Sequence, residues 1–246
     1  AIDTATPVAC HRADLLDTPP TSWDQVMELA LAGMVAVALV PINALMTFMG
    51  LARNRDLSLG ATPDALIDPA AGEALMADLR RLADNVPPRC FELDPIGIYD
   101  WMGSHPLGPA YSPWGYGYTN YSRDGYCDFP LTYADAPGFG QNGPRGTVLG
   151  GTGIAVSSRC KARDVAVDYA FWIAGADCQK GLYTASGGQP GHAAAWEDDT
   201  CNALTRNFFR NTRATLDSAW VRPRHDGYMT FQDRAGHIVQ AAIRHE

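Results

Sequence analysis

The stretch that decides the fold class is Leu29–Ala52, LALAGMVAVALVPINALMTFMGLA, which contains no charged residue. An uncharged segment of this length is long enough to cross a bilayer as one helix. Its interior argues against that, because Gly33 interrupts the helical pattern and Pro41 breaks the chain after the β-prone run Val35–Val40. The stretch therefore predicts a helix, a strand and a second helix, each buried in a soluble protein core.

Outward from this stretch, strands and helices alternate, which indicates an α/β fold. Ser22, three residues before Gln25, has the spacing of a capping box and marks the start of the first helix. Extended segments are expected at 2–10, 108–111 and 147–157; helices are expected at 69–83, 96–102, 163–174 and 177–185, and a mostly helical tail at 196–245, broken at 222–227.

Charge and motifs exclude several classes of function. The chain has 27 acidic and 19 basic residues, a net charge of −8, which disfavours binding to nucleic acid or to anionic membranes. The letters of Gly138-Phe-Gly140-Gln-Asn-Gly143 match a dinucleotide fingerprint. No strand precedes them and Pro144 follows where a helix should begin, so they predict a turn and no nucleotide cofactor.

Cysteine and histidine spacings predict no metal centre. The six cysteines are scattered, form no CxxC pair, and none has metal-ligand spacing with a histidine. Their number permits disulfides in an exported protein, but the connectivity stays open. His192 and His225 each lie in a Gly/Pro-rich loop, where a surface or capping role is favoured over a ligand contact.

An aromatic loop, Pro113-Trp-Gly-Tyr-Gly-Tyr-Thr-Asn-Tyr121, is the most informative local feature. Trp114, Tyr116 and Tyr118 alternate with glycines and would share one face of an extended chain. Such rings offer an apolar face for stacking and a polar edge, which suits the C–H face and hydroxyls of a sugar. The alternative is a strand edge whose tyrosines pack on the core.

Several segments together resemble an extracellular solute-binding protein of an ABC importer, of the family that includes maltose-binding protein. Ala1-Ile-Asp3, Arg12-Ala-Asp-Leu-Leu16 and Pro19-Pro-Thr-Ser-Trp-Asp24 are similar to that family's hinge-crossing strand and the segment after it. Ala110-Tyr-Ser-Pro-Trp-Gly115 resembles its strand ending in an exposed Pro-Trp, and Gly150-Gly-Thr-Gly-Ile-Ala-Val-Ser157 resembles its return through the hinge. The resemblance implies an α/β fold of the periplasmic-binding-protein type II class.

The same resemblance implies two lobes, with the second largely complete and the first partial. The second lobe would comprise 7–149 and 196–246, and the hinge and partial first lobe 1–6 and 152–195. About a hundred residues that family members have before this point do not occur here, so we expect either a fragment or a reduced form. A periplasmic or extracellular location is implied, although Asp3, His11 and Arg12 interrupt any signal-peptide core in this chain.

The implied function is non-enzymatic: a receptor that delivers a sugar or polyol to a membrane permease, without cofactor or metal. Carried over by position, the ligand-binding residues would be Asp3 (accepting hydroxyl hydrogen bonds), Trp114 and Tyr116 (stacking), Tyr118, Gly151, Thr152 and Tyr228. The alternative is a carbohydrate-active enzyme with two carboxylates across a scissile bond. Its candidates, Asp94, Asp100 and Asp128, carry no recognisable motif.

An incomplete first lobe should also leave apolar surface uncovered. Val165, Tyr169 and Trp172 recur at helical spacing and predict one apolar helix face. We expect another copy of the chain, a separate chain or a rearranged tail to cover this face, since large exposed apolar patches mark interfaces. The competing possibility is a second lobe that folds alone with 152–195 loosely attached.

Overall fold

The sheet at the centre of the protein has three antiparallel strands in the order β3-β2-β4. The computed structural model describes residues 1–60, 65–140 and 142–245. The strands are β2 (Pro7–Arg12), β3 (Tyr111–Tyr116) and β4 (Leu131–Ala134), and every residue of the central strand β2 is buried. The predicted strand after Gly33 is a buried extended segment that runs parallel to the start of β3, with one bridge between Val35 and Tyr111. The α/β class is confirmed.

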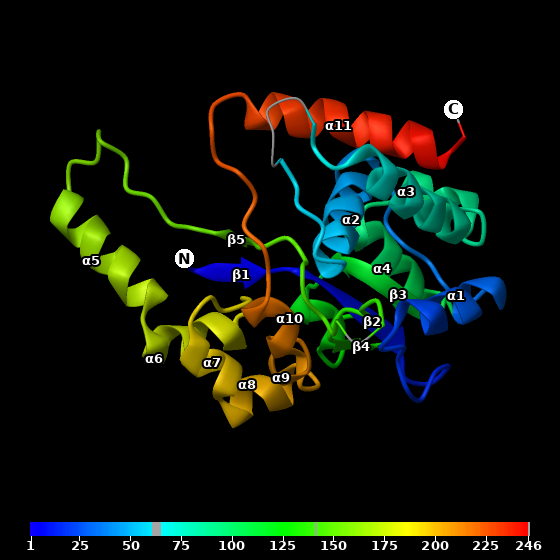
Figure 1. Ribbon diagram of the computed structural model, residues 1–246. Coiled ribbons are helices and arrows are strands. Elements are labelled where there is room, and N and C mark those ends of the chain that lie inside the picture. Colours follow the sequence, from blue (N-terminus) through cyan, green and yellow to red (C-terminus); the bar gives the residue numbers. More distant parts are fainter. Residues whose placement is uncertain (61–64, 141, 246) are drawn as a thin grey trace.

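Helices cover this sheet from the side on which α2 lies (Figure 1). They are α1 (Trp23–Leu31), α2 (Pro41–Asn54), α3 (Pro69–Ala83), α4 (Pro95–Ser104) and, from the end of the chain, α11 (Tyr228–Ile243). The expected capping box of Ser22 and Gln25 is present at the start of α1. The last helix crosses α2 and α3, and Gly236 permits the approach, because a Cβ there would lie 2.8 Å from the Pro41 carbonyl oxygen.

A second, two-stranded ladder joins β1 (Asp3–Ala5) to β5 (Gly150–Thr152), with Asp3 opposite Thr152. Beyond β5 the chain leads to α5 (Arg163–Ala174), which stands apart from the sheet (Figure 1). The chain returns through α6 (Ala176–Cys178), a π-helical turn at Gln179–Tyr183, and α7 (Ala193–Glu197). The ladder therefore lies between the sheet and the outlying helix α5.

The predicted helical tail is confirmed. It continues as α8 (Asp199–Leu204), α9 (Phe208–Asn211) and α10 (Arg213–Asp217), and the break before α11 is present. Phe208 lies against Tyr133 of β4 with ring centroids 4.8 Å apart, and Trp196 against Phe209 at 5.3 Å. The first contact attaches the tail to the central sheet, and the second joins α7 to α9.

Two local predictions are wrong in their extent, and a third agrees with the structure. The strand expected at 108–111 begins where that range ends, so that Trp114 and Tyr116 belong to β3 and not to a loop. The strand expected at 147–157 is only β5, because the following residues find no partner strand among those described. The turn at Gly138–Gly143 is present as a non-helical segment, with Gln141 outside the described residues.

No helix in the described ranges combines the length and the apolar character needed to cross a bilayer, in agreement with the prediction for Leu29–Ala52. The six cysteines are all free thiols. Among the described residues, no group of three or more His, Cys, Asp or Glu side chains is placed to hold a metal ion.

Candidate functional site

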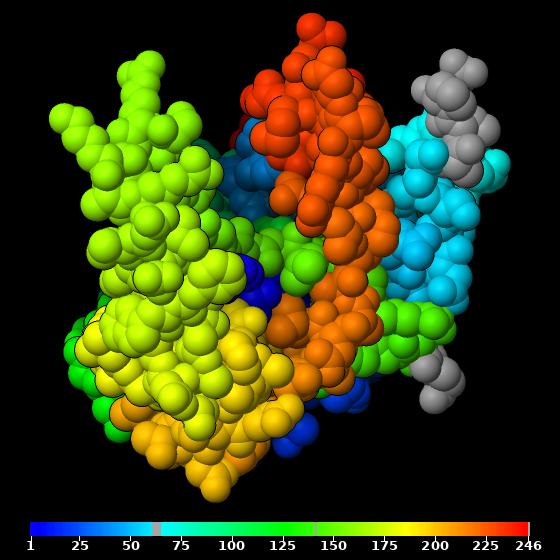
Figure 2. Space-filling view, turned by 90° about the vertical axis from the view of Figure 1, so that its left-hand side faces the viewer, coloured from blue at the N-terminus to red at the C-terminus, as the bar shows by residue number. Residues whose placement is uncertain are grey.

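A pocket of about 760 Å³ opens beside the β1–β5 ladder. One wall is the ladder itself, from Asp3 and Thr4 to Gly150–Gly153, and the opposite wall is the segment from Val221 to Gln232. Figure 2 shows the hollow between the yellow-green segment around α5 and the orange segment before α11, with the blue N-terminal residues at its base. The pocket is therefore formed by segments that are far apart in the sequence.

A second pocket, of about 350 Å³, lies on the other side of the same ladder. Its lining includes Asp3, Tyr116, Tyr118, Asn120 and Gln189. Asp3, Gly151 and Thr152 line both pockets. The two hollows thus share the ladder, and a ligand lying across it would contact both.

Asp3 places a carboxylate at this shared position. The side chain is half-buried, and burial raises the pKa of its carboxyl group above the usual value. No donor among the described residues hydrogen-bonds to its carboxylate oxygens. These oxygens are therefore available to hydroxyl groups of a ligand, in a setting where charge-assisted hydrogen bonds are strong.

Glycines allow the ladder to pack tightly. Gly151 has φ +140°, a conformation that favours glycine, and a Cβ there would lie 2.6 Å from the Asp3 carbonyl oxygen. A Cβ on Gly150 would lie 2.8 Å from Cε1 of Tyr116. The Tyr116 hydroxyl donates to the Val148 carbonyl oxygen at 3.2 Å, which holds the phenol beside the ladder. Burial raises the pKa of Tyr116, and the nearby Arg222 guanidinium opposes part of that rise.

Tyr118 is the aromatic side chain with an accessible ring in the second pocket, 40% exposed. Partial burial raises the pKa of its phenol, and the charges of Asp94 and then Asp3 add to the rise. Asp3 and Tyr118 both line the second pocket, so the carboxylate and the ring belong to one site. An exposed tyrosine face beside a carboxylate is the combination that sugars require.

Trp114 is a correction to the expected site. Its side chain is only 2% exposed and lines neither of the two pockets at the ladder. The indole lies against α2, where a Cβ on Gly50 would come within 2.8 Å of Cζ2. The reason is that α2 covers this part of β3, whereas Tyr116 and Tyr118 lie at and beyond the end of the strand, past the helix. Stacking of Trp114 on a ligand is therefore excluded in this structure.

The other expected residues lie at the site, and their role in binding remains a prediction. Tyr228, at the start of α11, is buried and lines the first pocket. Gly151 and Thr152 lie in the ladder. Two of the three candidate carboxylates of the enzyme alternative have other roles: Asp94 caps α4 by accepting from the Gly97 amide, and Asp100 accepts from the Tyr121 hydroxyl at 2.6 Å.

Two buried glutamines at the junction were missed by the sequence analysis. Gln189 accepts a hydrogen bond from the Thr119 amide and donates to the Thr4 and Gly117 carbonyl oxygens, at 3.0 to 3.1 Å. Gln179 donates to the Ile2 carbonyl oxygen at 3.1 Å and accepts from the Gly191 amide at 2.7 Å. They hold β1 against the returning chain. The only sequence signal is the Gly/Pro-rich setting of Gln189.

Comparison with known proteins decides the family. The sequence model described as bacterial extracellular solute-binding protein matches residues 2–206. The chain belongs to this family. No curated protein matches the sequence of this solute-binding protein.

Solved structures of sugar-binding proteins have the same fold. Maltose-bound MalE3 of T. maritima superposes with a TM-score of 0.80 at 18% identity, over 99% of this chain and 66% of the other. A solute-binding protein of Agrobacterium radiobacter K84 in complex with ribitol gives 0.79 at 17% identity, over 99% and 65%. One from Thermotoga lettingae bound with α-D-tagatose gives 0.75 at 18%, over 100% and 67%. This solute-binding protein thus spans about two thirds of the length of these structures.

Proposed function

We propose that this protein binds a small polyhydroxylated solute, a sugar or a polyol, across the β1–β5 ladder. The observation that carries the proposal is the shared position of Asp3, which lines both pockets with a carboxylate that no described donor engages. Tyr118 supplies an accessible ring within the same site. Support comes also from the relatives, whose structures contain maltose, ribitol and tagatose.

The proposal includes delivery of the solute to the membrane permease of an ABC importer, in the periplasm or outside the cell. Family membership supports an extracellular receptor. The same family consists of binding proteins and gives no support to the enzyme alternative.

Movement about the ladder is part of the proposed mechanism. The lobe formed by 7–149 and 196–246 would close on the part formed by 1–6 and 152–195. The chain crosses between the two parts beside β1 and β5, and hinge segments of this kind absorb a rotation. Hydrogen bonds from the Thr119 amide to Gln189 and from Arg123 to the Thr184 carbonyl oxygen also join the two parts, and closure has to keep or rearrange them. Closure would bring the two pocket walls onto the solute and exclude water from it.

Self-association is a second proposal, carried by α5. No residue of this helix is buried, and Val165 and Phe171 are 70% and 76% exposed. Tyr169 and Trp172 lie together on the helix, ring centroids 5.6 Å apart, and both are more than half exposed. Each such side chain is worth about 1.5–3 kcal/mol when buried, so an uncovered α5 is costly. A second copy of the chain is the occupant that we propose.

Calorimetric titration with maltose, ribitol and tagatose tests the proposed binding. We expect at least one of these three compounds to bind to the wild type. We expect Tyr118→Ala to bind that compound more weakly. Binding unaffected by Tyr118→Ala and by Asp3→Asn would contradict the proposed site.

A further inference from the structure

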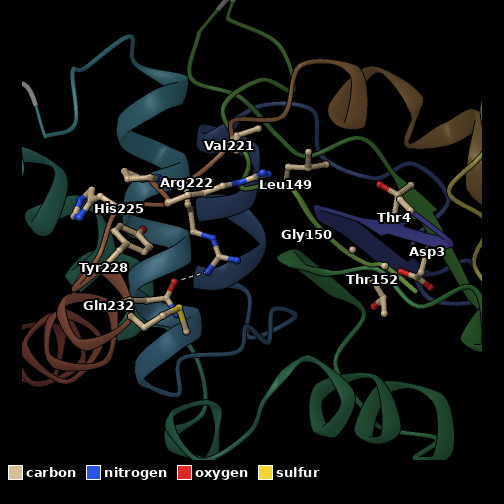
Figure 3. A pocket seen from close by; sticks show the side chains of 16 residues that line it. Asp3, Thr4, Leu149, Gly150, Thr152, Val221, Arg222, His225, Tyr228 and Gln232 are labelled. Atoms are coloured by element: carbon tan, nitrogen blue, oxygen red, sulfur yellow. Dashed lines mark hydrogen bonds between the residues drawn. The ribbon is translucent and has the colours of Figure 1, made fainter. Parts of the chain in front are cut away.

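The wall of the larger pocket opposite the ladder is basic. Arg222, Arg224 and His225 all line it, and Asp3, on the facing wall, is the only acidic side chain of the described lining. In Figure 3 the Arg222, His225, Tyr228 and Gln232 side chains occupy one side and Asp3 and Thr152 the other. A local concentration of positive charge is unexpected in a chain with a net charge of −8.

Arg222 is the best placed of the three. Its side chain is half-buried, and its Nη1 donates to the Gln232 amide oxygen, a neutral acceptor (Figure 3). No carboxylate of the described residues lies within salt-bridge distance of it. Other arginines in the protein are paired in that way, among them Arg12 with Asp14, Arg55 with Asp78, Arg145 with Asp56, Arg206 with Asp124 and Arg213 with Asp217. Because a guanidinium has five N–H donors, most of those of Arg222 remain for a ligand.

Two tyrosines adjoin this pocket: Tyr228 is part of its lining, and Tyr116 packs on Gly150 of the ladder. The charge of Arg222 acts on both Tyr116 and Tyr228, where it opposes the rise in pKa that burial causes. The Tyr228 hydroxyl is buried and has no hydrogen-bond partner among the described residues. Gln232, on α11 itself, orients the half-buried guanidinium through the hydrogen bond that Nη1 donates to its amide oxygen. A partly desolvated, oriented guanidinium binds planar anions through two parallel hydrogen bonds.

We propose that the solute is an acidic saccharide. Its carboxylate or phosphate is bound by Arg222, and its hydroxyls reach Asp3 on the facing wall of the pocket. This inference rests on the proposed function and adds the charge of the ligand. The geometry also separates the two ends of the ligand. The acidic group belongs on the wall from Val221 to Gln232, since near Asp3 it would meet a like charge. A neutral sugar would leave the Arg222 donors without a charged partner.

The test compares matched neutral and acidic ligands by calorimetric titration of the 246-residue chain. The probes are glucose with glucuronate and glucose 6-phosphate, and galactose with galacturonate. We expect the acidic member of at least one set to bind about tenfold or more tightly than the neutral one, and its affinity alone to fall with added salt. Preference for the uronate or for the phosphate identifies which anion fits.

Variants assign the effect to Arg222. Arg222→Gln should weaken binding of the acidic ligand about 10- to 100-fold and that of its neutral counterpart less than about threefold. Arg222→Lys keeps the positive charge but loses the paired N–H donors of the guanidinium, so its affinity for the acidic ligand should lie between those of the wild type and of Arg222→Gln. Arg159→Gln is the control, because this exposed arginine lies outside both pockets and its loss changes the net charge equally.

The outcomes separate the inference from the proposed function. Equal or tighter binding of the neutral sugars overturns the inference and leaves sugar binding intact. An equal loss of both ligand types in Arg222→Gln, in a variant that melts like the wild type, also overturns it. Absence of binding by every probe, together with maltose, ribitol and tagatose, overturns both.

Discussion

Gly151 and Asp3 approach each other in the ladder so closely that a methyl group on Gly151 would lie 2.6 Å from the Asp3 carbonyl oxygen. Gly151 also has φ +140°, a backbone conformation that residues other than glycine rarely adopt. The contact fixes the backbone of Asp3 at the point where both pockets meet.

Gly151→Ala should therefore open the ladder. We expect a loss of about 1–3 kcal/mol in unfolding free energy, or a local separation of β1 from β5, together with weaker solute binding. Thermal denaturation and titration measure the two effects. Gly153→Ala is the matched control, because no atom lies within 4 Å of a Cβ at that position. Equal changes in stability and in solute affinity for Gly151→Ala and Gly153→Ala would contradict the role of Gly151.

Trp114→Ala should destabilise the protein by about 3–5 kcal/mol, the usual range for deleting a large buried aromatic side chain. The indole fills the space beside Gly50, and nothing nearby can replace it without moving α2. Chemical denaturation measures the change. Leu107→Ala serves as control, since Leu107 is exposed, and should change stability by less than about 0.5 kcal/mol. A Trp114→Ala variant with wild-type stability would show that the residue is not part of the core.

The contrast between Trp114 and Tyr118 shows how far the sequence could go. Alternation of aromatic and glycine residues predicts a shared face, and it identifies the right segment for the site. It cannot show that α2 covers the first ring and ends before the last, because that depends on helix packing between distant segments. Local signals such as the capping box at Ser22 are confirmed.

Other parts of the site have no local signal at all. Arg222 reaches the ladder because the segment before α11 runs beside the residues that lead into β5, where the Leu149 amide donates to the Trp220 carbonyl oxygen. Likewise, Gln189 reaches Thr4 across 185 residues of sequence. The resemblance to a known family assigned Asp3, Gly151 and Thr152 to the ligand site, and in the structure the three residues lie together in the β1–β5 ladder.

Tyr118→Ala should weaken binding of the solute by about 1–3 kcal/mol, roughly 10- to 100-fold, through the loss of a stacking surface. The folded state should change little, because the ring is already 40% exposed. Tyr126→Ala is the control, an exposed tyrosine outside both pockets. A loss of affinity as large in Tyr126→Ala as in Tyr118→Ala would contradict a specific contact.

Asp3→Asn should separate stability from binding. Burial raises the pKa of the Asp3 carboxyl group in the folded state. The folded protein therefore holds the carboxyl proton more tightly than the unfolded chain does. The protonated Asp3 side chain therefore contributes its full stabilisation below pH 3.8, the ordinary pKa of this carboxyl group. That stabilisation is lost as the pH rises through the higher pKa of the folded state. We expect Asp3→Asn to be at least as stable as the wild type at pH 7 and to bind the solute more weakly.

Urea denaturation at pH 3.5 and pH 7 measures how the stability of the wild type relative to Asp3→Asn changes with pH, and calorimetric titration at pH 7 measures binding. The wild type should lose stability relative to Asp3→Asn between the two pH values. A wild type that gains stability over the variant as the pH rises would mean that the carboxylate is stabilised by a partner in the folded state. In that case its role as a free acceptor would be wrong.

The exposed face of α5 predicts association. Light scattering should show an assembly larger than one chain, and hydrogen exchange across 160–185 should slow as concentration rises. Trp172→Ser should reduce association, whereas Leu204→Ser, which alters an exposed apolar residue on α8, should not. A monomer with fast exchange over this range at all concentrations would contradict the proposal and favour a loosely attached α5.

The most direct test of the central claim, that this protein binds a polyhydroxylated solute across the β1–β5 ladder, is a thermal-shift screen of wild type and Asp3→Ala with neutral sugars, polyols and sugar acids. A ligand at about 100 times its dissociation constant stabilises the folded state by about 2.7 kcal/mol, a rise of roughly 5–10 °C in Tm for a chain of this size. We predict such a rise for at least one of these compounds with the wild type, and a much smaller one with Asp3→Ala. No rise with any compound, or an equal rise in both proteins, would contradict the claim.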